Sequence, residues 1–254
     1  MADGTKKETS VADAEGPGNS KKDYLLPVSV LIAGIMISAS VLYSTGNKNS
    51  PPNVAGGTTG PGELAALNAP NVSGLNLSNR DVVLGDAKAP ITFIGYGDYQ
   101  CPFCAGFFSQ TEPLLIKDYA NTGKVKFVFR NFQFLGSESF AAAEAAECAK
   151  DQGKFWAYHD ALYSAEETDG RENNGNLNRD LFLKLASDLK LEGNAFAKCI
   201  DGKKYTEQIK QDSAAAQSVG VDSTPISFIN GQKIQGALPY EQFKTIIDNI
   251  LNKK

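Results

Sequence analysis

The sequence predicts an α/β domain that follows an apolar segment and a polar linker. Two observations predict the domain: short runs alternate with the period of two found in strands, and longer runs carry apolar residues at helical spacing. A third observation places the apolar segment, because residues 24–43 contain no charged side chain. The 254 residues are 42% hydrophobic and carry a net charge of −4, which fits one globular domain with a tail and argues against a nucleic-acid-binding surface.

The folded part is expected to begin with the order β-β-α-β. Strands are predicted at 81–84, 91–96 and 125–130, where apolar residues cluster or alternate. A helix is predicted over residues 104–119, with a kink at Pro113, because proline cannot donate a helical hydrogen bond.

The second half of the domain is expected to contain a helical insertion at about 135–220, followed by the order β-β-α. Helical patterns cover 141–149, 155–163, 182–189 and 205–218. Asn230-Gly231 then separates two short apolar runs, 226–229 and 232–234, and this pattern predicts a hairpin with a type I′ turn. A final helix is expected to bury an apolar face formed by Phe243, Ile246, Ile247, Ile250 and Leu251.

Residues 24–43 are predicted to form a transmembrane signal anchor. Twenty helical residues span about 30 Å, which is the thickness of the hydrocarbon core. Lys21 and Lys22 precede this segment and only Lys48 follows closely, so the chain before it is expected in the cytoplasm and the chain after it outside. Cleavage as a signal peptide is the alternative, because Ser38-Ala39-Ser40 supplies small residues, although the apolar run exceeds the usual 7–15 residues.

The segments on either side of the predicted anchor are polar. Residues 1–23 have mixed charge and are expected to be a disordered cytoplasmic tail. Residues 44–79 are rich in Gly, Asn, Pro, Ser and Thr and are predicted to be a flexible linker with a root-mean-square span of about 30–35 Å. The folded domain is therefore expected to occupy residues 80–254.

The four cysteines form one close pair, Cys101 and Cys104, and one distant pair, Cys148 and Cys199. A CxxC motif between a strand and a helix is typical of redox proteins. The alternative is half of a zinc site, but a Cys₄ site normally has two close pairs. Because the distant pair is separated by 51 positions, we expect neither a metal nor another cofactor.

The position of Cys101 at a strand-to-helix junction suits a nucleophile. Thiolates attack disulfides, and a helix N-terminus stabilises a thiolate through its free N–H groups and its dipole. Pro102 suits the first helical turn, and Phe103 adds no side-chain donor. Cys104 lies one turn further on, where it can resolve a mixed disulfide, and only Cys101 is expected to be exposed.

Cys148 and Cys199 are expected to form a structural disulfide in an oxidising compartment. Such a bridge closes a loop of about 50 residues and stabilises the fold by roughly 4 kcal/mol. Two free buried cysteines are the alternative.

The segment from Gly97 to Cys104 resembles the active-site signature of DsbA-like thioredoxin-domain proteins. Further matches are Val128-Phe129-Arg130-Asn131-Phe132, Gln152-Gly153-Lys154-Phe155-Trp156, Tyr158-His159-Asp160, Ser223-Thr224-Pro225, Phe228-Ile229-Asn230-Gly231 and Gly236-Ala237, so the resemblance covers residues 79–252. It implies a thioredoxin-like fold and extracytoplasmic disulfide exchange, usually oxidation of secreted client polypeptides. It also implies a membrane redox partner that is DsbB-like or vitamin K epoxide reductase-like.

The resemblance assigns supporting roles to Thr224 and Pro225. It implies that Pro225 is cis and faces the CxxC motif, and that the backbone of Thr224 pairs with an extended client. One position departs from the family, because relatives often carry an acidic residue where this chain has Gly95. Asp98 matches the family, and we expect it nearer the surface.

Three functions remain open from the sequence. The first is an oxidase that donates disulfides, the second is a reductase or isomerase on the same fold, and the third is a tethered binding module without catalysis. The linker contains no dimerisation domain of the kind isomerases usually carry. His159, the only histidine, is expected to be a packed or half-exposed residue beside Trp156, and Arg130 is expected to be a structural charge partner.

Overall fold

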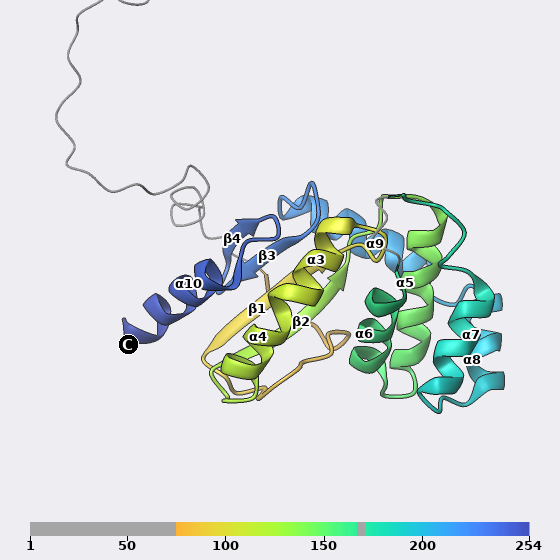
Figure 1. Cartoon of the computed structure of the whole chain (residues 1–254), viewed down its shortest axis with the longest axis horizontal. Coiled ribbons are helices and arrows are strands. Elements are labelled where there is room, and N and C mark those ends of the chain that lie inside the picture. The colour runs from red at the N-terminus through yellow and green to blue at the C-terminus, as the bar shows by residue number, and fades with distance from the viewer. Residues whose placement is uncertain (1–74, 167–170, 254) are drawn as a thin grey trace, which may run out of the picture. The chain divides into compact units, whose positions relative to one another are not determined.

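A four-stranded mixed sheet forms the centre of the computed structural model, which describes residues 75–166 and 171–253. The strands are β1 (Ile91–Gly97), β2 (Val125–Asn131), β3 (Ile226–Ile229) and β4 (Gln232–Gln235), and their order across the sheet is β2-β1-β3-β4 (Figure 1). Strand β1 pairs in parallel with β2 and antiparallel with β3, and β3 pairs antiparallel with β4.

Strand β1 is buried on both faces, which explains its nearly continuous apolar sequence. On one face, Ile91 and Phe93 pack with α3 (Pro102–Gln110), α4 (Glu112–Leu115) and the final helix α10 (Tyr240–Asn252). On the other face, Ile94 and Tyr96 pack with the end of helix α9 (Thr206–Ser218). The end of β1 is therefore held between two layers of helices.

The helix after β1 is interrupted near Pro113. Helix α3 spans Pro102–Gln110, α4 spans Glu112–Leu115, and a π-helical turn covers Ile116–Ala120. Pro113 has no N–H to donate to the carbonyl four residues earlier, and its ring collides with that carbonyl. The predicted kink is therefore a break between two helices.

The predicted helical insertion is present as a block beside the sheet, visible on the right of Figure 1. It contains α5 (Ser137–Lys150), α6 (Phe155–Ala165), α7 (Arg179–Asp188) and α8 (Gly193–Asp201), and α9 leads back to the sheet. The side chain of Asn178 caps α7 by accepting from the backbone N–H of Leu181. Apolar side chains of α5, α6, α7 and α8 pack with the CxxC segment in one core.

The β3–β4 hairpin has the predicted turn. Asn230 and Gly231 both have positive φ, at 48° and 85°, as a type I′ turn requires. One predicted strand is wrong: residues 81–84 form no strand of the sheet, and only Leu84 makes an isolated bridge with Phe127. Leu84 exchanges both backbone hydrogen bonds with Phe127 of β2, whereas the carbonyl of Val82 accepts from the indole N–H of Trp156 at 3.0 Å.

The predicted tail, the predicted anchor at 24–43 and most of the predicted linker lie outside the described residues. Within the part that is described, no helix is both long and apolar enough to cross a membrane.

Candidate active site

The CxxC motif begins where β1 ends, and a tight turn positions it. The backbone N–H of Cys101 donates to the carbonyl of Asp98 at 3.1 Å, and helix α3 starts at the next residue, Pro102. Gly97, just before this turn, leaves room for the ring of Phe129, because a Cβ atom on Gly97 would lie 2.7 Å from that ring. Cys101 is therefore the N-cap residue of α3, at the end of the helix where backbone N–H groups are free.

Asp98 is buried, so the expectation that it lies near the surface is wrong. Its carboxylate accepts backbone N–H groups from Gln100 at 3.0 Å, Phe134 at 3.1 Å and Leu135 at 3.2 Å. Burial raises the pKa of Asp98, while the nearby hydroxyl of Ser139 and the backbone donors oppose that rise. Asp98 thus ties the loop after β2 to the turn that carries Cys101.

The segment Thr224-Pro225 lies against the first cysteine. Its peptide bond is cis, and Sγ of Cys101 lies 3.5 Å from the carbonyl oxygen of Thr224. Residues 123 positions apart in sequence therefore meet at one sulfur atom. This is the place where the resemblance puts both residues.

The two thiols of the motif are free and have opposite electrostatics. A hydrogen bond from Cys104 is the main cause that lowers the pKa of Cys101 to about 6; burial opposes it, and Thr224 and the backbone N–H groups of Cys104 and Phe103 add to it. Burial, and next the hydrogen bond to Cys101, raise the pKa of Cys104 well above its ordinary value. One sulfur is therefore held as a thiolate and the other as a thiol.

The exposed surface around the motif is apolar. Cys101 is only 4% exposed, so the expectation that its side chain is exposed is wrong. Beside it, the ring of Phe103 is 70% exposed, and the ring of Phe134, on the loop that Asp98 holds, is 50% exposed. A partner that reaches Cys101 therefore meets exposed aromatic surface.

The distant cysteines are joined. Cys148 on α5 and Cys199 on α8 form a disulfide, with their Cα atoms 5.9 Å apart. The bridge lies inside the helical block and ties its first helix to its fourth.

Arg130 is an internal charge partner, as expected. Its guanidinium donates to both carboxylate oxygens of Asp81, at 2.8 and 2.7 Å, and to the hydroxyl of Tyr96 at 3.1 Å. Burial alone would raise the pKa of Asp81, but hydrogen bonds from Arg130 and Ser78 bring it below its ordinary value.

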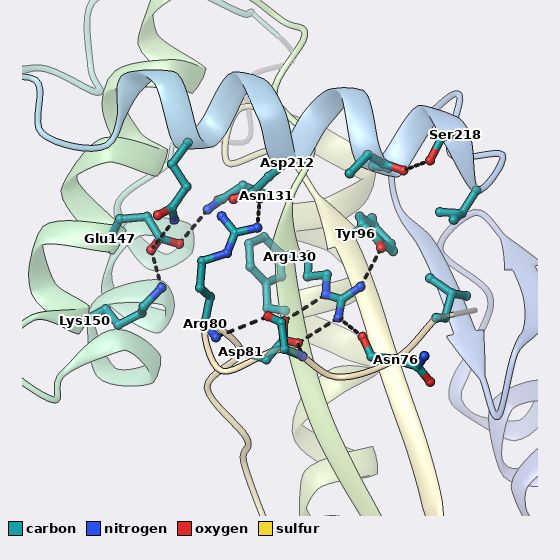
Figure 2. A pocket seen from close by; sticks show the side chains of 17 residues that line it. Asn76, Arg80, Asp81, Tyr96, Arg130, Asn131, Glu147, Lys150, Asp212 and Ser218 are labelled. Carbon is teal, nitrogen blue, oxygen red and sulfur yellow. Dashed lines mark hydrogen bonds and ion pairs between the residues drawn. The ribbon is translucent and has the colours of Figure 1, made fainter. Parts of the chain in front are cut away.

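These groups line a polar pocket of about 330 Å³ beneath α9 (Figure 2). Its charges are paired internally, since Arg80 also bonds Asp212 at 2.6 Å and Lys150 bonds Glu147 at 2.5 Å. No cysteine lines the pocket, which separates it from the chemistry of the motif.

A helix-capping cysteine with a depressed pKa, a buried second thiol and an opposing cis-proline segment form the geometry of thiol–disulfide exchange. Residues 77–249 match the family model described as thioredoxin. The chain is 31% identical over 186 residues to disulfide bond formation protein D of Bacillus subtilis, covering 72% of this chain and 82% of the relative. It is 30% identical over 174 residues to a probable disulfide bond formation protein D of Bacillus anthracis, covering 67% and 78%.

Two solved structures show the same fold. BdbD from Bacillus subtilis, in its oxidised form, aligns with a TM-score of 0.65 at 30% identity and covers 72% of this chain and 98% of its own. Wolbachia pipientis alpha-DsbA1 aligns with a TM-score of 0.63 at 28% identity and covers 70% and 94%. The chain belongs to the thioredoxin family, as a DsbA-like thiol–disulfide oxidoreductase.

Proposed function

We propose that this enzyme donates disulfides to reduced client polypeptides outside the cytoplasm, with Cys101 as nucleophile and Cys104 as resolving cysteine. The observation that carries the proposal is the opposite pKa shift of the two thiols. A stabilised thiolate favours the reduced form of the motif, because the disulfide carries no charge there. The disulfide is then an oxidant, since its reduction gains the stabilisation that oxidation forfeits.

The reaction proceeds through a mixed disulfide. A client thiolate attacks Sγ of Cys101, the Cys101–Cys104 bond breaks, and its electron pair leaves on Cys104. A second client thiolate then attacks the client sulfur, and Cys101 leaves as a thiolate stabilised by the helix end. The client has lost two electrons, and the enzyme has gained them as a dithiol.

The surroundings of Cys101 support a broad range of clients. The carbonyl of Thr224 lies beside the sulfur and offers backbone pairing that needs no particular client sequence. The exposed rings of Phe103 and Phe134 favour apolar, unfolded segments, which are the segments that carry unpaired cysteines before folding.

The proposed location is the outer face of the cell membrane, with residues 24–43 as an uncleaved anchor. The Lys21 and Lys22 bias supports this orientation, and the Cys148–Cys199 disulfide fits an oxidising compartment. A DsbB-like or vitamin K epoxide reductase-like membrane protein would accept the electrons and restore the disulfide.

Cys104→Ala should accumulate mixed disulfides with client proteins, because the thiolate of Cys101 still attacks client disulfides and the thiol that would expel the bound client is absent. Cys101→Ala should form none, because the raised pKa of Cys104 leaves its thiol protonated. The check is non-reducing electrophoresis of membranes after acid quenching. Equal trapping by both variants would reverse the assignment of the two cysteines.

Protease added to intact spheroplasts should release the folded domain, because the charge bias places residues 44–254 outside. The measurement is immunodetection of the domain in the supernatant, with a cytoplasmic protein as the control for lysis. A domain protected until detergent is added would show the opposite orientation.

A further inference from the structure

A small cavity lies beside Cys104, between the sheet and helices α3, α4 and α6. Its wall includes Cys104, Gly95, Trp156 and the side chain of Glu112. The space is about 20 Å³ for the centre of a water-sized sphere, and roughly 10–15 Å³ is enough to hold one water molecule. Cys104 and Glu112 therefore line a common space that is large enough for a water molecule.

Cys104 needs a group that donates a proton to its sulfur and accepts it back during exchange. Its side chain is 3% exposed, so bulk water does not reach it directly. Each exchange cycle makes it a leaving thiolate or an attacking thiolate, and burial disfavours both charged species. A group within the protein must therefore supply and remove its proton.

Glu112 is a buried carboxylic acid with one oxygen that accepts no hydrogen bond from the described residues. It begins α4 directly after the break in the helix, and its Oε1 has no hydrogen-bond partner within the described part of the chain. Burial raises the pKa of Glu112, while His159 opposes that rise and Asp160 adds to it. The group is thus a weaker acid and a stronger base than an exposed glutamate.

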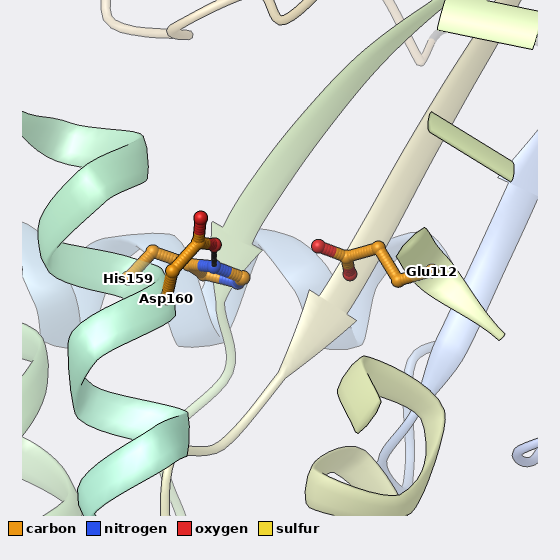
Figure 3. A group of neighbouring side chains, drawn as sticks. All are labelled: Glu112, His159 and Asp160. Carbon is orange, nitrogen blue, oxygen red and sulfur yellow. Dashed lines mark hydrogen bonds and ion pairs between the residues drawn. The ribbon is translucent and has the colours of Figure 1, made fainter. Parts of the chain in front are cut away.

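His159 and Asp160 of α6 lie opposite Glu112 (Figure 3). Its ring is fully buried, beyond the packed or half-exposed position expected from the sequence, and its Nε2 has no partner among the described residues. Its Nδ1 lies 3.1 Å from Oδ1 of Asp160, whose side chain is 56% exposed. A ring nitrogen of His159 and one carboxylate oxygen each of Glu112 and Asp160 all lie within 4.8 Å of one another.

The other ionisable groups near the cavity are poor candidates. Burial raises the pKa values of Tyr99 and Tyr163 well above their ordinary values, so both hold their protons. Asp98 does not line the cavity, and its carboxylate already accepts three backbone N–H groups. The ionisable groups that act directly on Glu112 are His159 and Asp160 of α6.

We propose that Glu112 carries the proton of Cys104, through one water in the shared cavity, and exchanges it with solvent through His159 and Asp160. The inference rests on the proposed function, because it assigns a further group to the same exchange reaction.

The proton movements balance in both half-reactions. When Cys104 leaves as a thiolate, the Glu112 carboxyl gives its proton through water to Sγ, which leaves a thiol and a carboxylate. When Cys104 closes the disulfide, the carboxylate takes the thiol proton, Sγ attacks Cys101, and the bound thiolate departs with the bonding pair. His159 and Asp160 return the carboxyl to its starting state.

The test is the closure step of the full-length chain in detergent, with glutathione disulfide as the probe. Reduced enzyme first forms a mixed disulfide at a rate set by the probe concentration, and Cys104 then expels glutathione at a rate independent of it. Trp156, the only tryptophan of the chain, lines the same cavity as Cys104 and supplies the fluorescence signal.

In the unmodified protein the closure rate should rise as pH passes through the carboxyl pKa and then level off, because the carboxylate is the base. Glu112→Gln should slow closure by at least about tenfold near neutral pH, in line with loss of a general base. Its rate should instead rise continuously with pH, because hydroxide must then generate the thiolate. Mixed-disulfide formation should be unchanged, since that step uses Cys101.

Glu144→Gln is the matched control. Glu144 is buried like Glu112, but it lies on α5, accepts from the hydroxyl of Thr206 at 2.8 Å, and lines no part of the cavity. This variant should close at the unmodified rate. Equal closure rates and equal pH profiles in Glu112→Gln and Glu144→Gln would overturn the proposal, and so would an unmodified enzyme whose rate rises without a plateau.

His159→Phe tests the route to solvent while keeping a ring among the surrounding aromatic side chains. It should lose the plateau as Glu112→Gln does, and an unchanged profile would overturn the route through His159. Failure of the proposed function gives a distinct result, because it shows in the unmodified enzyme alone, which would not oxidise a dithiol client. The role of Glu112 is tested by comparing variants with the unmodified enzyme.

Discussion

Replacing Cys148 and Cys199 together by alanine is expected to lower the free energy of unfolding by about 4 kcal/mol. The bridge spans 51 positions, so its loss frees a long loop in the unfolded chain. In a domain of this size the melting temperature should fall by roughly 8–16 °C. The measurement is thermal unfolding of the full-length protein, followed by the fluorescence of Trp156.

The loss should be concentrated in the helical block, because the bridge joins α5 to α8. Amide hydrogen exchange should accelerate in α7 and α8 and stay slow in β1 and β2. Cys101→Ala/Cys104→Ala is the control, since those thiols are free, and it should leave the exchange of α7 and α8 unchanged. A fall in melting temperature of less than about 2 °C in the bridge variant would show that the disulfide contributes little to stability.

Local patterns predicted the regular elements well where burial is two-sided or where a turn has a strict chemical requirement. Strand β1 is apolar because both faces are covered, and the hairpin follows from Asn230-Gly231, which tolerate positive φ. Residues 81–84 have a similar composition to a strand, yet they make only one bridge. The outer edge of β2 is open to a further strand, yet these residues pair with it at one position only, and composition does not reveal how many residues of such a segment will pair.

The site was predictable only in part, for a physical reason. The motif from Cys101 to Cys104 is local in sequence, and the resemblance supplied Thr224 and Pro225. Glu112 gave no signal, since a glutamate beside Pro113 is ordinary for a first helical turn. Its burial depends on the break between α3 and α4 and on the distant helix α6, and neither can be deduced from the residues around it.

At neutral pH the reduced protein is expected to melt at a higher temperature than the oxidised protein, with Cys148 and Cys199 bridged in both. The thiolate of Cys101 gains hydrogen bonds from Cys104 and from the backbone N–H groups of Cys104 and Phe103, and the disulfide has no charge to stabilise. Each 1.4 kcal/mol of this advantage raises the reduction potential by about 30 mV and the melting temperature by roughly 3–6 °C. A higher melting temperature for the oxidised protein would contradict the oxidase proposal and favour a reductase.

The extra stability of the reduced protein over the oxidised protein should depend on pH in a defined direction. The folded pKa of Cys101, about 6, lies below the value of about 8.5 for an unfolded cysteine. A group whose folded pKa is depressed contributes its full stability above the unfolded pKa and loses it as pH falls through the folded pKa. The difference between the two melting temperatures should therefore be largest near pH 8.5 and shrink as pH falls toward 6. Above about pH 8.5 the raised pKa of Cys104 acts in the opposite direction, because the unfolded chain releases that proton more readily than the folded protein.

Cys101→Ala is the matched control for this pH dependence, because it keeps Cys104 and removes the thiolate at the helix end. Between about pH 8.5 and 6, the melting temperature of this variant should fall less than that of the reduced unmodified protein. Differential scanning calorimetry of the reduced, oxidised and Cys101→Ala proteins across this range measures all three curves. If the reduced protein and the variant fall in parallel, the pH dependence arises from other groups, and the thiolate of Cys101 is not what stabilises the reduced form.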